Sequence, residues 1–353
     1  MTAFGLNEKM RNDGVCRHSF ISSFTFLISH FLFLILCFIF SHAVAQNPVK
    51  QYGQLQVKGT QLCDQKGNPV TLRGVSFSWH NWWPRFYNKK VMKTLKRDWH
   101  CTVVRAAMGV QPDESPEDGY LKNPQLAMSC MTPIIETAIK QNVYVIIDWH
   151  SHHMYTQEAK QFFGEMAQKY GHYPHIIYEI YNEPIEDTWT DLKKYATEVI
   201  GEIRKYDPDN IVLVGSPHWD QDIHLVANSP LEGFQNVMYT VHFYAATHGD
   251  ELRQRTEEAV KSGIPVFISE CGAMEATGDG DVDMESEEQW IGMCERLGIS
   301  WLCWSISDKD ETCSMLLPQA KSAGPWPDSV IKPYGKMVKG MLQKYNLSPN
   351  SKR

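Results

Sequence analysis

The fold is decided by a short apolar run, Val143-Tyr144-Val145-Ile146-Ile147-Asp148, and by seven similar runs spread along the chain. The full set covers residues 70–76, 102–107, 143–148, 175–180, 211–215, 238–243, 265–270 and 299–304. Their starts are 27 to 36 residues apart, with one gap of 41. Short runs that are hydrophobic almost throughout are typical of strands buried on both faces, as in a parallel sheet.

Amphipathic stretches lie between these runs. Residues 123–140, 190–205 and 287–297 carry apolar side chains three and four positions apart, which places them on one face of a helix. Eight strand–helix units without an intervening linker predict an α/β fold, a single-domain (β/α)8 TIM barrel over residues 46–345. A doubly wound open sheet is the alternative, but eight evenly spaced units favour closure. Residues 346–353 form a short polar tail, which contains the N-glycosylation sequon Asn346-Leu347-Ser348.

The first 45 residues have the pattern of a secretory signal peptide. A mildly basic start leads into the apolar residues 31–40, and a small-x-small motif, Ala43-Val44-Ala45, follows. An uncleaved membrane anchor is the alternative, because the apolar zone extends back to Phe20, but Ser22, Ser23, Ser29 and His30 interrupt it. We therefore expect cleavage after Ala45 and a secreted, extracellular protein that no longer contacts the membrane.

The charge and the cysteines of the mature chain limit its partners. Residues 46–353 carry 31 basic and 39 acidic side chains, which argues against nucleic acid as a partner. They also include seven cysteines. An oxidising destination permits disulfides, although the odd number leaves at least one thiol unpaired. None has CxxC spacing, which argues against a zinc site built on them.

Polar and aromatic side chains gather where the predicted strands end. Active sites of such barrels lie at the carboxyl ends of the strands. Those positions hold Arg105, Asp148, Trp149, His150, Asn182, Glu183, His242, Tyr244, Glu270 and Trp304. Any one of them has an ordinary structural explanation, but their joint occurrence on several strand ends predicts a catalytic site. A pair of carboxylates at one rim is the requirement for cutting glycosidic bonds.

Seven motifs make the chain resemble glycoside hydrolase family 5 from about residue 50 to residue 345. They are Leu72-Arg73-Gly74, Val104-Arg105-Ala106-Ala107-Met108, Asp148-Trp149-His150, Tyr178-Glu179-Ile180 through Asn182-Glu183-Pro184, His242-Phe243-Tyr244, Ile268-Ser269-Glu270 and Trp304-Ser305. The likeness is to the secreted endo-β-1,4-glucanases of the bacterial type, which also occur in some invertebrates. It implies a monomeric, cofactor-free cellulase that acts on cellulose and other β-1,4-glucans with retention of anomeric configuration.

The resemblance also implies roles for the two glutamates. Glu183 is the expected general acid/base, with a raised pKa, and Glu270 is the expected nucleophile, held ionised by Arg105 and Tyr244. Their carboxyl groups should lie about 5–5.5 Å apart. Asn182 is expected to bond the 2-hydroxyl group of the sugar.

Further residues follow from the same resemblance. His150 and His242 are expected to position the acids and the sugar. Trp304, Trp82 and Trp219 are expected sugar platforms, and Lys309 is an expected sugar ligand. Packing is the expected role of the other tryptophans considered, Trp79, Trp83, Trp149 and Trp301. The chain departs from the family pattern twice, with Cys271 in place of the usual aromatic residue after the nucleophile and Ser78, followed by His80, in place of a sugar-binding histidine.

Three other functions compete with this interpretation. A mannanase or xylanase of the same fold is the nearest, because subsite details distinguish the substrates. A metal-dependent hydrolase would use the ligand-rich stretch Asp148-Trp149-His150-Ser151-His152-His153, but further ligands are few. A non-catalytic glycan-binding barrel should have lost one carboxylate, and both are present. The acidic residues 279–283 lack the glycine and glutamate that an EF-hand requires, so we expect no metal and read them as a solvated loop.

Overall fold

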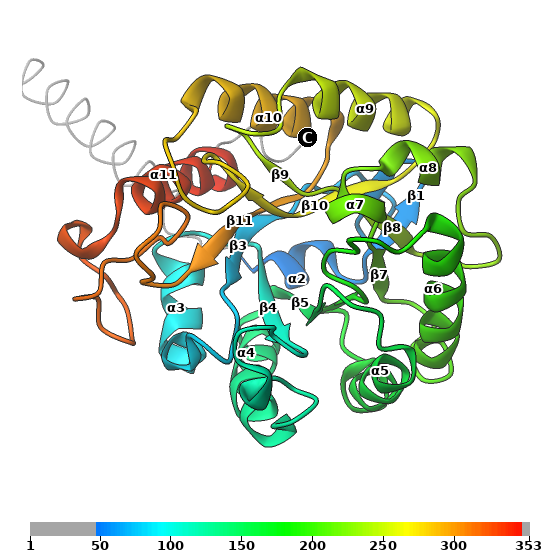
Figure 1. The fold of residues 1–353 in the computed structure, drawn as a ribbon, viewed down its shortest axis with the longest axis horizontal. Helices are drawn as coiled ribbons and strands as arrows, with labels where there is room; N and C mark the ends of the chain where they lie inside the picture. The colour runs from blue at the N-terminus through cyan, green and yellow to red at the C-terminus, as the bar shows by residue number, and fades with distance from the viewer. Residues whose placement is uncertain (1–46, 348–353) are drawn as a thin grey trace, which may run out of the picture. The chain divides into compact units, whose positions relative to one another are not determined.

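The computed structural model describes residues 47–347, so the expected leader lies outside the described residues. Eight parallel strands form a closed barrel (Figure 1). They are β3 (Arg73–Phe77), β4 (Val103–Gly109), β5 (Tyr144–His150), β6 (Ile176–Glu179), β7 (Ile211–Val214), β8 (Val237–Thr240), β10 (Val266–Gly272) and β11 (Trp301–Ile306). Pairing of β11 with both β10 and β3 closes the ring, which confirms the predicted TIM barrel and excludes the open sheet.

Helices surround the barrel and cover its outer face (Figure 1). The described helices are α2 (Pro48–Tyr52), α3 (Lys89–Arg97), α4 (Pro124–Gln141), α5 (Thr156–Tyr170), α6 (Trp189–Ile203), α7 (Pro217–Asp220), α8 (Ile223–Asn228), α9 (Asp250–Lys261), α10 (Met284–Leu297) and α11 (Pro333–Leu347), with 3-10 turns at Pro84–Phe86, Pro116–Asp118 and Asp328–Val330. The three helices predicted from periodicity correspond to α4, α6 and α10. Their first turns are capped by side chains: Asn123 caps α4, Thr188 caps α6 and Asp283 caps α10. None of the helices in residues 47–347 has both the length and the apolar character of a bilayer span.

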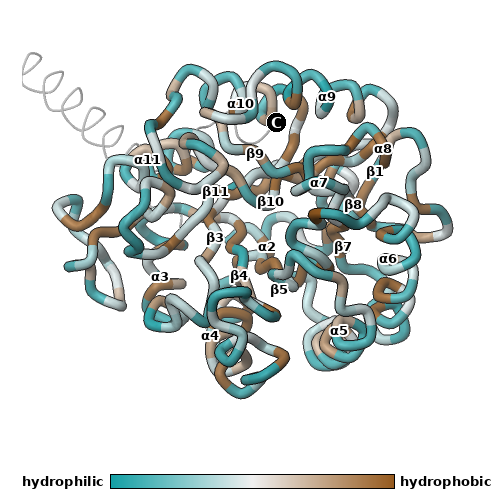
Figure 2. The backbone as a smooth tube through the Cα atoms, in the orientation of Figure 1, coloured by the Kyte–Doolittle hydropathy of each residue, from teal (hydrophilic) through white to brown (hydrophobic). Residues whose placement is uncertain are grey.

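Side-chain alternation along the strands decides which groups face the barrel interior. In β5, Tyr144 and Ile146 belong to the inner apolar cluster, whereas Val145 and Ile147 pack outside against the helices. Because alternate side chains share a face, Asp148 and His150 also point inward. Hydrophobic stretches follow the central strands in Figure 2, and hydrophilic ones follow the outer helices.

The amino end of the barrel is closed by an apolar plug. The antiparallel hairpin of β1 (Gln56–Lys58) and β2 (Gln61–Cys63) supplies Leu62, and α2 supplies Val49, to the same cluster as Leu72 and Val103 at the strand starts. The carboxyl end is therefore left as the open end of the barrel. One predicted run, residues 238–243, is divided in the structure into β8 and a two-residue strand, β9 (Phe243–Tyr244), which pairs with β10.

The structure bears on two features that the sequence left open, the cysteines and the sequon. All seven cysteines in residues 47–347 are buried and free. The expected tail begins inside α11, where the buried Asn346 side chain donates to the His100 carbonyl oxygen at 2.9 Å. Because this amide nitrogen is buried and engaged, the sequon is a poor glycan acceptor in the folded chain.

Replacing Glu287 with glutamine is expected to stabilise the protein increasingly as pH rises from about 4.5 to about 8. Burial raises the pKa of Glu287 to about 8, against 4.5 in the ordinary case. The folded chain therefore keeps a proton that the unfolded chain releases, and the free energy of unfolding falls as pH rises through this interval. The glutamine variant does not lose stability in this way. Its free energy of unfolding should exceed that of the parent by on the order of 4 kcal/mol at pH 8 and equal it at pH 4. Urea unfolding in a chelating buffer measures the difference, and an equal difference at both pH values would contradict the assignment.

Candidate active site

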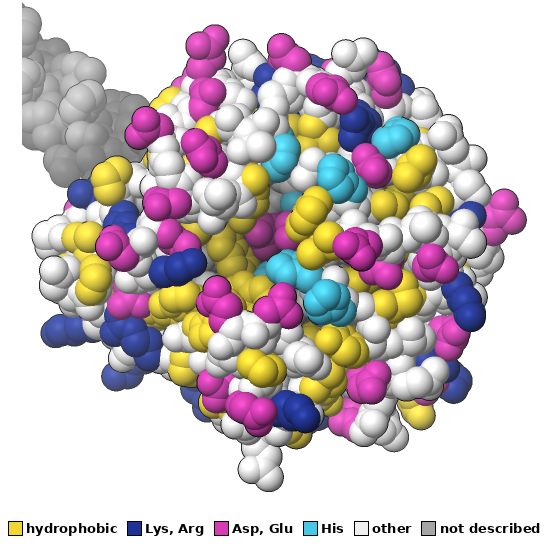
Figure 3. Space-filling view, viewed as in Figure 1, with side chains coloured by type: hydrophobic (Ala, Val, Ile, Leu, Met, Phe, Trp, Pro, Cys, Tyr) yellow, Lys and Arg dark blue, Asp and Glu magenta, His cyan; other side chains and the backbone are white. Residues whose placement is uncertain are grey.

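The two predicted catalytic glutamates meet at the open end of the barrel. Glu183 follows β6, and Glu270 lies near the end of β10. One carboxylate oxygen of each and a ring nitrogen of His242 lie within 4.8 Å of one another. The two glutamates line a cavity of about 220 Å³, and Figure 3 shows acidic and histidine side chains around a central hollow on this face.

An irregularity in β10 aims Glu270 into the cavity. Phe267 points into the barrel and Ile268 points outward, so regular alternation would send Glu270 outward with Ile268. The pairing of β10 with β11 shifts its register between Ile268 and Cys271. As a result Ser269 and Glu270 both make inward contacts, and Cys271 packs outside.

Glu270 is held by the two residues predicted to hold it. Arg105 Nη1 donates to Glu270 Oε2 at 2.7 Å, and the Tyr244 hydroxyl donates to Oε1 at 2.6 Å. Burial nevertheless raises the pKa of Glu270, and the nearby charge of Glu183 adds to this effect while Arg105 opposes it. The carboxylate is thus oriented by two donors and made more basic, and so more nucleophilic, by its surroundings.

The expectation of a raised pKa at Glu183 is wrong for the free protein. Burial by itself raises the pKa of Glu183, but hydrogen bonds from His152 and His242 outweigh it and lower the pKa below its usual range. His242 Nδ1 lies 2.8 Å from Glu183 Oε1, and His152 Nε2 lies 3.4 Å from Oε2. Although burial opposes it, the carboxylates around His242, Asp220 foremost, raise the pKa of the imidazole. The proton therefore belongs to the Glu183–His242 pair as a coupled unit.

Arg105 is the centre of the buried charge network. Its guanidinium group is fully buried and donates to Glu179 at 2.7 and 3.1 Å and to Asn182 Oδ1 at 2.6 Å, and it lies 3.1 Å from Asp148 Oδ2. Because Asn182 accepts through its oxygen, its amide nitrogen is turned to donate to another group. This is the orientation that a bond to a sugar hydroxyl requires.

His150 is fixed as part of the cavity wall. Its Nδ1 lies 2.7 Å from Asp148 Oδ2, and its ring stacks parallel to the Trp304 ring with centroids 5.1 Å apart. Burial and the positive charge of Arg105 lower the pKa of His150 well below its usual value. His150 is therefore neutral, and it positions other groups instead of supplying charge.

The aromatic residues divide into cavity residues and others. Trp82 and Trp304 line the cavity, as predicted, and Lys309 lies there with its Nζ 2.5 Å from Glu311 Oε2. Trp149 and Trp301 are fully buried and pack, as predicted. Trp79 and Trp83 were expected to pack, but they too line the cavity. Trp219 stands apart: it is exposed, and the structure does not place it among the cavity residues.

The structure adds four residues that the sequence-based list omitted. Glu179 pairs with Arg105, and Ser269 donates to Glu179 and contacts His242. Asp220 lies 3.4 Å from His242 Nε2, and His152 contacts Glu183. Glu179 had a detectable signal, since it is a buried carboxylate in the run that precedes Glu183. Asp220 had none, because it reaches the barrel through a left-handed turn at His218–Asp220.

The two departures from the family pattern have different outcomes. Ser78 lines the cavity, but His80 turns away from it: its Nδ1 accepts from the Gly109 amide at 3.0 Å, and burial lowers its pKa to about 4. His80 therefore does not replace the missing sugar-binding histidine. Cys271 is fully buried outside the barrel, 3.9 Å from the Cys303 sulfur.

The site donors that could hold a metal already make hydrogen bonds to protein side chains. Glu183, His242 and Glu270 are close enough to share an ion, but each makes hydrogen bonds inside the network. In the ligand-rich stretch, His150 faces Asp148 and Trp304, while His152 faces Glu183. The arrangement therefore fits acid–base chemistry by carboxylates better than a metal centre. A larger hollow of about 700 Å³ lies beside the β1–β2 hairpin, away from Glu183 and Glu270.

Residues 63–310 match the family model described as cellulase, glycosyl hydrolase family 5. The chain belongs to glycosyl hydrolase family 5. The resemblance stated from the motifs is thereby confirmed for the family.

Named relatives and solved structures of family 5 agree with this assignment. The chain is 38% identical over 328 residues to an endoglucanase of Clostridium saccharobutylicum and 39% identical over 308 residues to endoglucanase 5 of Pectobacterium carotovorum subsp. carotovorum. These alignments cover 91% and 85% of this chain but 72% and 60% of the relatives, so the chain spans only part of their length. The catalytic domain of a Thermobifida fusca endoglucanase superposes with a TM-score of 0.79 at 36% identity, covering 84% of this chain and 99% of that one. A structure from Cytophaga hutchinsonii superposes with a TM-score of 0.82 at 43% identity, and the match covers 85% of this chain and 98% of that one.

Proposed function

We propose that this family 5 glycoside hydrolase is a retaining endo-β-1,4-glucanase with Glu183 as acid/base and Glu270 as nucleophile. The observation that carries the proposal is the approach of their carboxylate oxygens to within 4.8 Å. Retaining enzymes hold the two carboxyls about 5–5.5 Å apart, whereas inverting enzymes leave about 6.5–9.5 Å for a water molecule. A double displacement fits the short separation.

In the first step, Glu270 attacks the anomeric carbon while the bond to the leaving sugar breaks. The proton held by the Glu183–His242 pair passes through Glu183 to the departing glycosidic oxygen, and a glycosyl ester forms on Glu270. Forming the ester removes the negative charge of Glu270. Arg105 keeps its other carboxylate partners, Glu179 and Asp148, so the site remains compensated.

In the second step, Glu183 acts as a base. It takes a proton from water, the hydroxyl attacks the anomeric carbon, and Glu270 leaves as a carboxylate. Two inversions at the same carbon give net retention. The Asn182 amide, oriented by Arg105, is placed to donate to the 2-hydroxyl group during both steps.

The substrate is proposed from the named relatives and from the aromatic cavity. Seven relatives that are 36–40% identical to this chain are named endoglucanases. A variant of the Thermobifida fusca enzyme, which is 35% identical to this chain, was solved in complex with cellotetraose. Flat indole rings in the cavity suit the apolar faces of equatorially substituted glucose. Reducing-sugar release from carboxymethylcellulose, glucomannan, an unmixed mannan that contains no glucose, and xylan, measured side by side, tests this choice. Fastest release from xylan or from an unmixed mannan would reject the glucanase in favour of those activities, and a rapid fall in viscosity marks internal cleavage.

Replacing Trp82 with alanine is expected to weaken substrate binding more than replacing Trp219 does. Trp82 lines the cavity and packs on Trp79 with ring centroids 5.0 Å apart, whereas Trp219 is exposed and lies outside the set of cavity residues. Loss of one stacking platform should raise KM for cello-oligosaccharides by roughly tenfold, the equivalent of about 1.4 kcal/mol, with kcat less affected. Initial rates over a range of cellopentaose concentrations measure both constants. A larger KM effect from Trp219→Ala would show that the binding groove extends over α7.

We also propose that the protein is secreted, acts as a monomer and carries no metal in its glucanase site. The apolar leader and the small-x-small motif before Gln46 support secretion. Expression of the whole chain in a eukaryotic secretion host should place activity in the medium, with Gln46 as the first residue. Activity that stays with the membrane fraction would instead support the anchor. Light scattering during size separation tests the monomer, and unchanged activity in a chelator tests the metal-free mechanism.

A further inference from the structure

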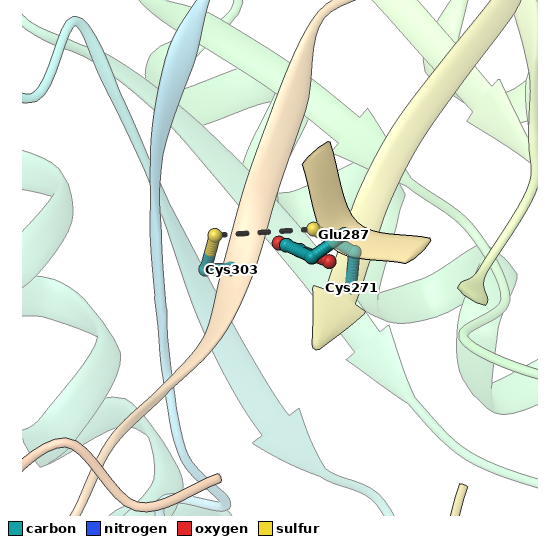
Figure 4. A group of neighbouring side chains, drawn as sticks. All are labelled: Cys271, Glu287 and Cys303. Carbon is teal, nitrogen blue, oxygen red and sulfur yellow. Dashed lines mark hydrogen bonds between the residues drawn. The ribbon is translucent and has the colours of Figure 1, made fainter. Parts of the chain in front are cut away.

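Three potential metal ligands from different elements meet behind the barrel wall. Cys271 lies on β10, Cys303 on β11 and Glu287 on α10. One donor atom of each lies within 4.8 Å of the others, and the two sulfur atoms are 3.9 Å apart. Figure 4 shows the Glu287 side chain reaching from α10 toward the two thiols. All three residues are buried, between the outer face of the barrel and the helix layer.

Glu287 points into this group without a partner. Its side chain is 1% exposed, and neither of its carboxylate oxygens has a hydrogen-bond partner. A buried polar group without a partner is strongly unfavourable, and native proteins rarely keep one unless a ligand or a function uses it. The orphaned carboxylate is therefore a second observation, independent of the cysteine pair, that points to a missing ligand.

The spacing of the donors fits one ion in particular. Tetrahedral zinc holds thiolate sulfur at about 2.3 Å, so two sulfur ligands of the same ion lie about 3.8 Å from each other. The observed 3.9 Å matches this value with little rearrangement. Thiolates exclude magnesium and calcium, and a carboxylate beside them suits zinc among the softer cations.

We propose that Cys271, Cys303 and Glu287 form a Zn²⁺ site that ties β10 and β11 to α10. Binding displaces the two thiol protons and the carboxyl proton into solvent, so the affinity should increase with pH. A search for CxxC spacing misses this site because successive ligands are 16 residues apart along the chain. They meet only through strand pairing and helix packing.

The site adjoins the candidate nucleophile. Cys271 directly follows Glu270, and the two side chains lie on opposite faces of β10. A bound ion would fix the strand from behind without entering the sugar cavity. Bound zinc should therefore raise the melting temperature, and its loading should be slow because the site is closed to solvent.

Cobalt titration tests the proposal with a signal that only sulfur ligands give. The purified protein is reduced, freed of metal with a chelator and titrated with Co²⁺ at pH 7.5. We expect near-ultraviolet charge-transfer absorption from cobalt–thiolate bonds, saturating at one equivalent and abolished by added Zn²⁺. Carboxylate and histidine donors of the sugar cavity cannot produce this band. Absence of the band would overturn the proposal, and so would a Cys271–Cys303 disulfide in the unreduced protein.

Matched variants locate the ion. Glu287→Gln and Cys303→Ser should each lower zinc affinity by roughly 100-fold or more, beyond the usual effect of residues that only support a ligand. Cys63→Ser, a change of the same kind at a buried cysteine of β2, should leave the affinity unchanged. Glu287→Gln keeps both thiols and the shape of the side chain, so the test stands even if a cysteine variant does not fold. Equal affinity in all variants would reject the site. Because the readout is metal binding, that result would leave the proposed glucanase activity intact.

Discussion

Replacing Glu270 with glutamine is expected to abolish glucan hydrolysis while the protein stays folded. The amide keeps the size of the carboxylate and its contact with Tyr244, but it cannot form the glycosyl ester. We expect kcat to fall by roughly 10⁴-fold or more, the equivalent of at least about 5.4 kcal/mol of transition-state stabilisation. Arg105 keeps two carboxylate partners, so the melting temperature should change little. Assays on carboxymethylcellulose and thermal unfolding measure the two effects.

Azide separates the roles of the two glutamates. With an aryl cellobioside that has a good leaving group, Glu270→Ala should regain turnover in azide and give an α-glycosyl azide, because azide attacks once from the vacated side. Glu183→Ala should give the β-azide, since the ester on Glu270 still forms and azide then replaces water. Glu275→Gln, an exposed glutamate in the loop after β10, is the control and should keep parental activity. Substantial activity of Glu270→Ala without azide, or the opposite azide configurations, would reject the assignment.

Replacing Arg105 with methionine should produce the largest loss of stability of any single change in the site. The arginine is fully buried between Asp148, Glu179 and Glu270, at 3.1, 2.7 and 2.7 Å. Removing one partner of a buried ion pair leaves uncompensated charge and costs about 3–5 kcal/mol. Chemical denaturation at pH 7 should show this loss, together with a loss of activity, because Glu270 and Asn182 lose their common donor.

The loss of stability in Arg105→Met should increase with pH. Without the arginine, the buried carboxylates of the variant have folded-state pKa values above their unfolded ones, so its stability falls as pH rises through that interval. The deficit relative to the parent should therefore be smaller at pH 4.5 than at pH 7.5. Arg105→Lys keeps the positive charge but loses the planar guanidinium group. Its stability should therefore lie between that of the parent and that of the methionine variant. A methionine variant as stable as the parent would show that the network contributes little.

Much of the site was predictable because strand ends converge in a barrel. Arg105, His150, Asn182 and Tyr244 were all read from their positions at or just after the ends of apolar runs, and the structure brings each into contact with the network around the glutamates. The same logic overlooked Glu179, which lies inside the run that precedes Glu183 and was quoted only as part of a family motif. His152 and Asp220 come from loops, whose paths a strand pattern does not determine.

Electrostatic predictions were less successful than positional ones. We expected Glu183 to carry a raised pKa, as an acid in an apolar setting would. The hydrogen bonds from His152 and His242 reverse that direction, and the proton is shared by a pair instead of being held by one residue. Such a shift depends on distances between groups that are far apart in sequence, so composition around Glu183 could not reveal it.

The amino-acid sequence by itself determined the eight strands and the helices between them, since hydrophobic periodicity is a local property that each segment expresses on its own. Tertiary structure decided which way the decisive side chains point. The irregular register between β10 and β11 turns Glu270 into the sugar cavity and leaves Cys271 facing Cys303 and Glu287 on the other side. The direction of these side chains depends on how β10 and β11 pair. The energy of that pairing depends on both strands and on the helix packed against them, so the sequence of one strand alone does not determine it.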